Sequence, residues 1–193
     1  IVREYRKKFP RVSVALHELS TPDQVHALHD NRIDIGFLRP PIPTQLLELE
    51  PIQKLSCTLC LPKAHPLAEK EEIHIEDLRD EPFVFITRPV WPALYDTILS
   101  LCREVGFSPR IVQEATEYQT VMGLVAAGIG ITVIPVSANK LYKTEVVYKE
   151  LCDSNFVAEM SVAYKKMNTN PELLEFLKIA REKKRIEVED EIN

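Results

Sequence analysis

Apolar and polar positions follow two rhythms along this chain. Residues 11–19 alternate between apolar and polar positions, and short continuous apolar runs occur at residues 33–39, 55–61, 82–86 and 130–135. Alternation is typical of a half-buried β-strand, and a short apolar run bounded by turn residues is typical of a buried one. The pattern therefore predicts a strand in each segment. Three further strands are predicted at residues 110–113, 146–151 and 160–165.

Stretches with helical periodicity separate these strands. Helices are predicted at residues 1–9, 21–30, 92–106, 116–127 and from 171 onward. Strands that alternate with helices predict an α/β fold in which helices cover mainly parallel sheets. The alternation falls into two blocks, and the apolar segments at 55–61 and 160–164 could pass between them.

The second helix has the clearest start and end signals. Thr21 is a favourable N-cap, Pro22 suits the first helical position, and Gln24 completes a capping box with Thr21. Asn31 can adopt the left-handed conformation that commonly ends a helix. We therefore expect Thr21 to cap this helix and Asn31 to close it.

Composition narrows the possible functions. A chain of 193 residues that is 45% hydrophobic suits one globular domain or two small lobes. Its net charge of −5 argues against a nucleic-acid-binding surface, because DNA-binding domains present a basic face. The basic residues Arg181, Lys184 and Arg185 are interpreted as a solvated helix face. No apolar run reaches the about 18 residues of a membrane span, and no signal peptide is visible. We expect a cytoplasmic protein without membrane contact.

The chain contains four cysteines, two of which form a C-x-x-C motif. Such a motif can bind zinc or undergo redox chemistry when it lies in a loop. Cys57 and Cys60, however, fall in a predicted strand, where residues three apart point to opposite faces. They are interpreted as buried free thiols in a reducing compartment, and Cys102 is interpreted as a core residue.

Metal binding and catalysis find little support. His26 and His29 lie three apart on a predicted helix, where a metal site is conceivable and a solvated helix face is the favoured interpretation. His17 and Ser20 are close in sequence, but no nucleophile–base–acid pattern includes them. With 5 glycines, the chain has no glycine-rich phosphate loop. The sequence therefore predicts no metal, no cofactor and no catalytic residue.

Four motifs, in order along the chain, resemble those of the effector-sensing domain of LysR-type transcription regulators. They are HELSTPDQVHALHDNRIDIGFLR at 17–39, LPKAHPLA at 61–68, IEDLRDEPFVFI at 75–86 and VMGLVAAGIGITVIP at 121–135. The last is the strongest match. The resemblance covers essentially the whole chain.

The resemblance implies two Rossmann-like α/β lobes joined by two crossing strands, as in type 2 periplasmic binding proteins, with a ligand cleft between them. Lobe one would comprise residues 1–54 and 160–193, and lobe two residues 55–159. The first strand of lobe one and an N-terminal winged helix-turn-helix are expected upstream of Ile1. The domain would then form a homodimer or homotetramer and reach DNA only through that upstream part.

In lobe one, Thr21 and Arg39 are the principal candidates for ligand contact. A helix start carries unpaired N–H groups and a partial positive charge that bind anions, and the resemblance places Ser20 and Thr21 at the cleft. The alternative for Thr21 is that it only caps its helix. Arg39 ends a buried strand, where its guanidinium could clamp a carboxylate; the alternative is a surface ion pair. The motifs place no acidic residue in this lobe that would receive a cation.

In lobe two, the turn between the strand at 82–86 and the next helix is the corresponding candidate. Trp91 could stack on a flat ligand or pack in the core or at a dimer contact, and Leu94 stands where aromatic-acid sensors place a ring. The predicted effector-binding residues are Ser20, Thr21, Pro22, Arg39, Thr87, Arg88, Trp91, Pro92 and Leu94.

The sequence thus predicts a sensor of a small organic anion, with a carboxylate as the expected effector. One alternative is the solute-binding protein of a transporter, which would carry an export signal. Another is an enzyme on the same fold, such as an acid-forming dehydratase, which would need an acid–base pair. The residues upstream of Ile1 would distinguish the three.

Overall fold

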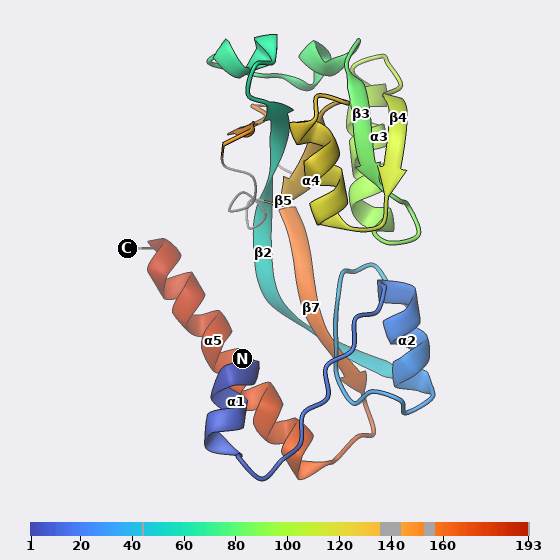
Figure 1. The fold of residues 1–193 in the computed structure, drawn as a ribbon. Helices are drawn as coiled ribbons and strands as arrows, with labels where there is room; N and C mark the ends of the chain where they lie inside the picture. The colour runs from blue at the N-terminus through green and yellow to red at the C-terminus, as the bar shows by residue number, and fades with distance from the viewer. Residues whose placement is uncertain (44, 136–143, 153–156, 193) are drawn as a thin grey trace. The chain divides into compact units, whose positions relative to one another are not determined.

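The computed structural model describes residues 1–43, 45–135, 144–152 and 157–192 (Figure 1). The chain divides into two compact units. Unit 1 comprises Ile1–Lys54 and Glu159–Asn193, and unit 2 comprises Leu55–Ala158. The chain passes from one unit to the other within two strands, β2 (Leu47–Pro62) and β7 (Val157–Lys165).

Unit 1 places helices on both faces of a short stretch of sheet. Its elements, besides its parts of β2 and β7, are α1 (Val2–Lys8), α2 (Thr21–His29), β1 (Gly36–Leu38) and α5 (Pro171–Ile192). Strand β1 pairs antiparallel with β7, from Gly36 opposite Ala163 to Leu38 opposite Ser161, and β7 in turn neighbours β2.

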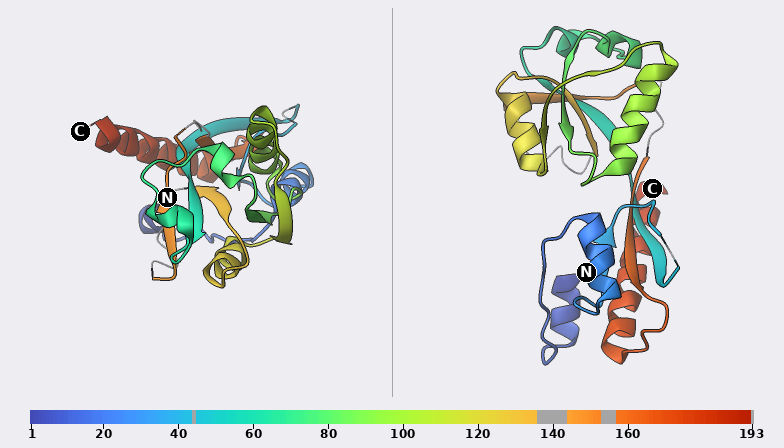
Figure 2. Two further views of the ribbon diagram at one scale, coloured as in Figure 1. Left: turned by 90° about the horizontal axis from the view of Figure 1, so that it is seen from above. Right: turned by 90° about the vertical axis from the view of Figure 1, so that its right-hand side faces the viewer.

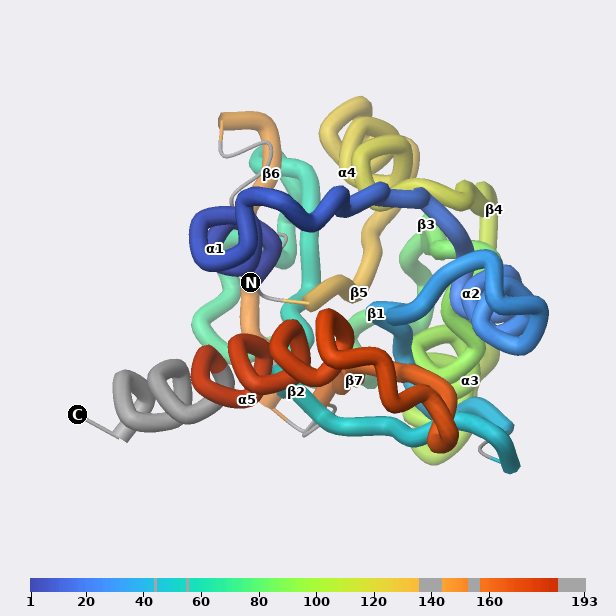
Figure 3. Tube along the Cα trace, turned by 90° about the horizontal axis from the view of Figure 1, so that it is seen from below, coloured from blue at the N-terminus to red at the C-terminus, as the bar shows by residue number. Residues whose placement is uncertain are grey.

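Alternating residues of β7 serve the two faces of this sheet. Ala163 packs with Leu28 of α2 on one face, and its neighbour Val162 packs with Leu173 and Leu177 of α5 on the other. Successive side chains of a strand point to opposite faces, so one strand supplies both cores. The helices α1 and α5 lie side by side (Figure 3).

The predicted strand at residues 11–19 is wrong. Residues 13–20 are extended chain without strand pairing, and Leu16 is 71% exposed. Alternation shows which side chains could share a face, but a strand also needs a neighbour for its peptide groups. In the described part of unit 1, β1 pairs with β7 along one edge, and no other described strand lies next to β1.

Unit 2 is built on β3 and β4, with helices on either side (Figure 2, right). Its elements, after its part of β2, are the 3-10 helices Pro66–Glu69 and Ile75–Leu78, β3 (Pro82–Ile86), α3 (Pro92–Glu104), β4 (Arg110–Ala115), α4 (Tyr118–Ala126), β5 (Thr132–Pro135) and β6 (Val146–Lys149). Apolar residues of α3 and α4 pack over the strands in one core that includes Leu94, Ile98, Cys102, Met122 and Val125.

The expectation of mainly parallel sheets is wrong for the described strands. Strands β3 and β4 pair in parallel, and a parallel bridge joins Phe83 to Ile131, but β1 pairs antiparallel with β7, and β2 pairs antiparallel with both β5 and β6. Parallel neighbours need a crossover connection. Periodicity identifies the extended segments without giving their direction, so it missed the pairings made by the long strands β2 and β7.

The N-cap of α2 differs from the prediction, whereas the residue that follows its C-terminal end agrees with it. Ser20, not Thr21, caps α2: its Oγ accepts a hydrogen bond from the backbone N of Asp23 at 3.3 Å. Asn31 follows the helix with a φ of 55°, which confirms its left-handed conformation. Lys165 of β7 donates to the Asn31 side chain at 2.8 Å and thereby holds the end of α2 against the sheet.

No helix in the described part of the chain combines the length and hydrophobicity of a membrane span.

Gly130 lies where two backbone segments of unit 2 approach each other closely. A Cβ at this position would lie 2.4 Å from the carbonyl oxygen of Pro82. The adjacent bonds, from Ile131 N to Pro82 O and from Val84 N to Ile131 O, are both 2.8 Å long and fix that distance. The last glycine of the VMGLVAAGIGITVIP motif is therefore a packing requirement.

We predict that Gly130→Ala lowers the free energy of unfolding by about 3 kcal/mol, because backbone must shift to admit the methyl group. Urea denaturation followed by circular dichroism measures the loss. Gly106→Ala is the control: Gly106 has a φ of 81° and no atom within 4 Å of its Cβ position, so only a conformational cost of about 1–2 kcal/mol applies. Equal losses in the two variants would contradict the prediction.

Candidate functional site

The start of α2 and the end of β1 meet in unit 1. The backbone N of Arg39 donates to Oγ1 of Thr21 at 3.5 Å, and Thr21 is only 8% exposed. Two predicted site residues that lie 18 positions apart are thus brought together. Because the Thr21 hydroxyl faces the strand end, it does not cap its own helix, and the preceding serine takes that role.

An acidic residue lies beside this helix start, which the sequence prediction missed. Oδ2 of Asp23 accepts a hydrogen bond from the Ser20 hydroxyl at 2.5 Å. The carboxylate offsets part of the positive end of the helix dipole. The Asp23 N–H is taken by Ser20, and Pro22 has no N–H. In the first turn as described, Thr21 alone keeps a backbone N–H for a ligand.

Gln24 fixes the turn that leads into α2. Its Nε2 donates to the carbonyl oxygen of Leu19 at 3.0 Å, so it does not form the predicted capping box with Thr21. Its Oε1 would lie 2.9 Å from a Cβ built on Gly36. Gly36, in the motif at residues 17–39, therefore makes room for the glutamine that holds this turn.

In unit 2, Arg88 is engaged in a bidentate ion pair. Its Nε and Nη2 donate to the two carboxylate oxygens of Asp96 on α3, at 2.7 and 2.9 Å. The hydrogen bonds raise the pKa of Arg88 and lower the pKa of Asp96. Both side chains are about half exposed, so the pair adds little stability. A ligand anion at Arg88 would have to compete with this carboxylate.

Trp91 and Leu94 lie in the core of unit 2. They are 2% and 3% exposed, and the Trp91 ring meets the Tyr118 ring edge-on, with centroids 6.0 Å apart. This burial favours the core alternative for Trp91. Pro92 begins α3, and the backbone of Thr87 donates to Ala115 O at 3.0 Å, so both residues shape the turn after β3.

A charged cluster in unit 1 escaped the sequence prediction. Arg181, interpreted as part of a solvated helix face, donates to Oε2 and Oε1 of Glu50 at 2.7 and 2.6 Å. The Tyr164 hydroxyl donates to Glu50 as well, at 2.6 Å. Burial, followed by this bond, raises the pKa of Tyr164 to about 12. The cluster connects α5 to β2 and β7. Of its members, the sequence analysis had considered only Arg181.

Comparison with known proteins identifies the domain. The family model described as "LysR substrate binding domain" matches residues 1–185. This chain belongs to the LysR substrate binding domain family. The HTH-type transcriptional regulator AlsR of Bacillus subtilis is 49% identical over 180 residues, which are 93% of this chain and 60% of AlsR. The HTH-type transcriptional regulator CatR of Pseudomonas putida is 34% identical, over 89% of this chain and 58% of CatR.

Solved structures agree with this assignment. The "BenM effector binding domain with its effector benzoate" has a TM-score of 0.81 at 25% identity and covers 96% of this chain and 85% of that one. Full-length CbnR in complex with its target DNA has the same fold, with a TM-score of 0.81 over 95% of this chain and 64% of CbnR. The fold is that of type 2 periplasmic binding proteins, and the LysR resemblance is confirmed.

The curated relatives also decide the class of function. They are named as transcription regulators, and the family is one of regulators, so the prediction that this domain is not an enzyme is confirmed. The LysR substrate binding domain described here spans about 60% of the length of these relatives.

The cysteines of this LysR domain are poor candidates for chemistry. Burial raises the pKa of the Cys57 and Cys60 thiols to about 12 and that of Cys102 to about 11. Cys60 is fully buried, with its Sγ 3.8 Å from Sδ of Met122. Within the described ranges, no three His, Cys, Asp or Glu side chains gather closely enough to hold a metal.

We predict that mild peroxide treatment forms no intramolecular disulfide. The thiolate is the reactive form, and pKa values of about 11 and 12 leave these buried thiols protonated at neutral pH. Intact-mass spectrometry checks this, since a disulfide removes two protons. The exposed thiol of Cys152 provides an internal control, because it should react first with a maleimide. A two-proton loss in the monomer would overturn the prediction.

Proposed function

We propose that this LysR domain senses a small organic anion, with a carboxylate as the group recognised, and signals to a DNA-binding part of a longer regulator. The observation that carries the proposal is the meeting of Thr21 with the backbone of Arg39. It brings a hydroxyl, a helix N-terminal N–H and an arginine to one edge of the unit 1 sheet, a chemistry suited to a carboxylate.

The charges at this edge of the sheet favour binding of a carboxylate with moderate affinity. The Arg39 guanidinium offers paired donors, and Thr21 offers one N–H and one hydroxyl. Asp23, hydrogen-bonded to Ser20 in the first turn of α2, opposes the anion. Recognition therefore depends more on Arg39 than on the helix dipole. The structural neighbour BenM is described with benzoate as its effector, which makes benzoate a rational first probe.

Unit 2 has its own candidate contacts for an effector anion. We propose Thr87 and Arg88 as polar contacts, with Arg88 exchanging its Asp96 partner for the effector anion. Trp91 and Leu94 would then support this turn from the core below it, and Pro92 would fix the start of α3. Such an exchange gives ligand-bound and ligand-free forms different ion pairs, and a signal requires this kind of difference between two states.

The transporter alternative has less support. The relatives named above are regulators with a helix-turn-helix, whereas a solute-binding protein would have relatives in transport.

Binding of the anion would shift the population of regulator conformations. DNA contact would belong to a separate part of the longer polypeptide.

We predict that Arg39→Ala weakens binding of the carboxylate effector by about 1.5–3 kcal/mol, because a charge-assisted hydrogen bond is lost. A thermal-shift screen that begins with benzoate and continues through small carboxylates identifies the effector, and calorimetric titration measures the affinity. Arg3→Ala, which removes an exposed arginine from α1, is the matched control and should bind as the wild type does. Thr21→Val should also weaken binding, through the lost hydroxyl and not through a lost helix cap. Unchanged affinity of Arg39→Ala, or a cationic effector, would refute the proposed site.

We further predict a homodimer of the isolated domain. Two-fold pairing is the commonest assembly of soluble proteins, and we propose that α3 lies at the contact. In the structure the apolar stripe of α3 serves the core of unit 2, so a contact through α3 would use partly buried residues such as Ala93, Thr97 and Leu101. Light scattering on a concentrated sample should give twice the 22.1 kDa mass of the chain. A 22.1 kDa species at every concentration would contradict the dimer.

A further inference from the structure

A carboxylate of β7 lies at the same end of the unit 1 sheet as Thr21 and Arg39. Oε1 of Glu159 accepts a hydrogen bond from the Ser161 hydroxyl, with the two oxygens 3.0 Å apart. Glu159 is half-buried, and Ser161 is completely buried. The sequence analysis assigned neither residue a role, because both lie outside the four motifs that carry the LysR resemblance.

The pairing of β7 with β1 fixes where these two residues lie. Leu38, the residue before Arg39, is opposite Ser161. Glu159 is therefore the diagonal neighbour of Leu38, and such neighbours lie about 7–8 Å apart. The backbone N of Arg39 in turn reaches Oγ1 of Thr21. Glu159 thus lies at the end of β1 where the proposed anion site is formed.

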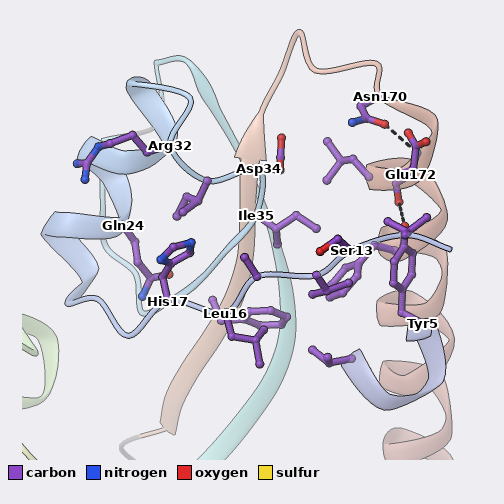
Figure 4. A pocket seen from close by; sticks show the side chains of 18 of the residues that line it. Tyr5, Ser13, Leu16, His17, Gln24, Arg32, Asp34, Ile35, Asn170 and Glu172 are labelled. Carbon is purple, nitrogen blue, oxygen red and sulfur yellow. Dashed lines mark hydrogen bonds between the residues drawn. The ribbon is translucent and has the colours of Figure 1, made fainter. Parts of the chain in front are cut away.

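Glu159 and Ser161 point to the face of the sheet that α2 covers. Side chains two positions apart on a strand share a face, and Ala163 of the same series packs in the core beneath α2. The other face belongs to α5. Figure 4 shows the two helices on opposite sides of β7, with Gln24 on α2 and Glu172 on α5. The Glu159 carboxylate and the first turn of α2 therefore share one face at one end of the sheet.

Ser161 orients this carboxylate without neutralising its charge. A buried hydroxyl needs a hydrogen-bond partner within the protein, and Glu159 supplies the acceptor. A carboxylate has about four acceptor positions, so Glu159 can also accept a hydrogen bond from a ligand. A ligand donor would form a charge-assisted hydrogen bond there, whereas a second carboxylate on the ligand would be repelled.

We propose that Glu159, positioned by Ser161, selects effectors that carry a hydrogen-bond donor a few bonds from their carboxylate, and that it rejects dicarboxylates. The donor would be a hydroxyl or an ammonium group. The inference rests on the proposed function, in which Arg39 and Thr21 bind the carboxylate. Asp23 in the first turn of α2 acts in the same sense, because two negative charges beside Arg39 favour a ligand with a single carboxylate.

Four acids with the same four-carbon chain test the proposal: butanoate, 3-hydroxybutanoate, 3-aminobutanoate and butanedioate. Calorimetric titration should show at least one of the two donor-bearing acids binding about tenfold more tightly than butanoate, the difference expected from one hydrogen bond to a charged group. Butanedioate should bind more weakly than butanoate. The hydroxyl and amino acids of the series distinguish the two kinds of donor.

Glu159→Gln keeps the size of the side chain and an acceptor for Ser161 but removes the charge. The preference over butanoate should fall to about threefold or less, because a neutral hydrogen bond is weaker, and butanedioate should no longer be disfavoured. Ser161→Ala should also reduce the preference, because Glu159 loses the hydrogen bond that orients it. Glu48→Gln, at an exposed position of β2 in the same unit, is the matched control and should keep the wild-type preferences.

The outcomes separate this inference from the proposed function. Equal affinities for butanoate and both donor-bearing acids would overturn the role of Glu159, as would failure of both donor-bearing acids to bind. A preference that survives in Glu159→Gln, with only Tm lowered, would assign the Ser161–Glu159 bond to stability alone and refute the inference. If butanoate binds and Arg39→Ala weakens it while no preference exists, the proposed function stands and only the selective role of Glu159 is lost.

Discussion

A peptide group removed from water needs a hydrogen-bond partner, and this requirement shapes both units. Where a neighbour exists, the predicted extended segments are strands: β3 pairs with β4, and β1 pairs with β7. Where the described chain offers no neighbour, as at residues 11–19, strong alternation yields extended chain and an exposed Leu16. Where two backbones crowd together, as at Pro82 and Gly130, a side chain has no room.

The proposed anion site depends on that framework. Arg39 and Thr21 meet only because β1 and α2 are packed on the same edge of unit 1, with Gln24 holding the intervening turn. Asp23 shows that a helix start is not automatically an anion site. The Asp23 carboxylate offsets part of the positive charge at the helix start, and the Ser20 cap occupies the Asp23 N–H. The arginine therefore carries the greater part of the expected affinity.

In unit 2, Arg88 pairs with the carboxylate of Asp96, and a ligand anion would have to replace that carboxylate. The Arg88–Asp96 pair is exposed and bidentate, a contact that costs little to break in water. A pair that breaks easily in one state and reforms in another suits a sensor better than a buried one, whose separation leaves an uncompensated charge. The neighbouring Trp91 and Leu94 are core residues that position this turn.

The sequence by itself determined the family, the α/β class, and the location of nearly every helix and strand, because periodicity and start or end signals such as Pro22 and Asn31 act within a few residues. It also placed Thr21 and Arg39 among the candidates. The tertiary structure alone decided strand direction, the choice of Ser20 over Thr21 as cap, the burial of Trp91, and the pairing of Arg181 with Glu50 across 131 positions. Each of these depends on which distant segment becomes a neighbour, and local hydrophobic patterning carries no information about that choice.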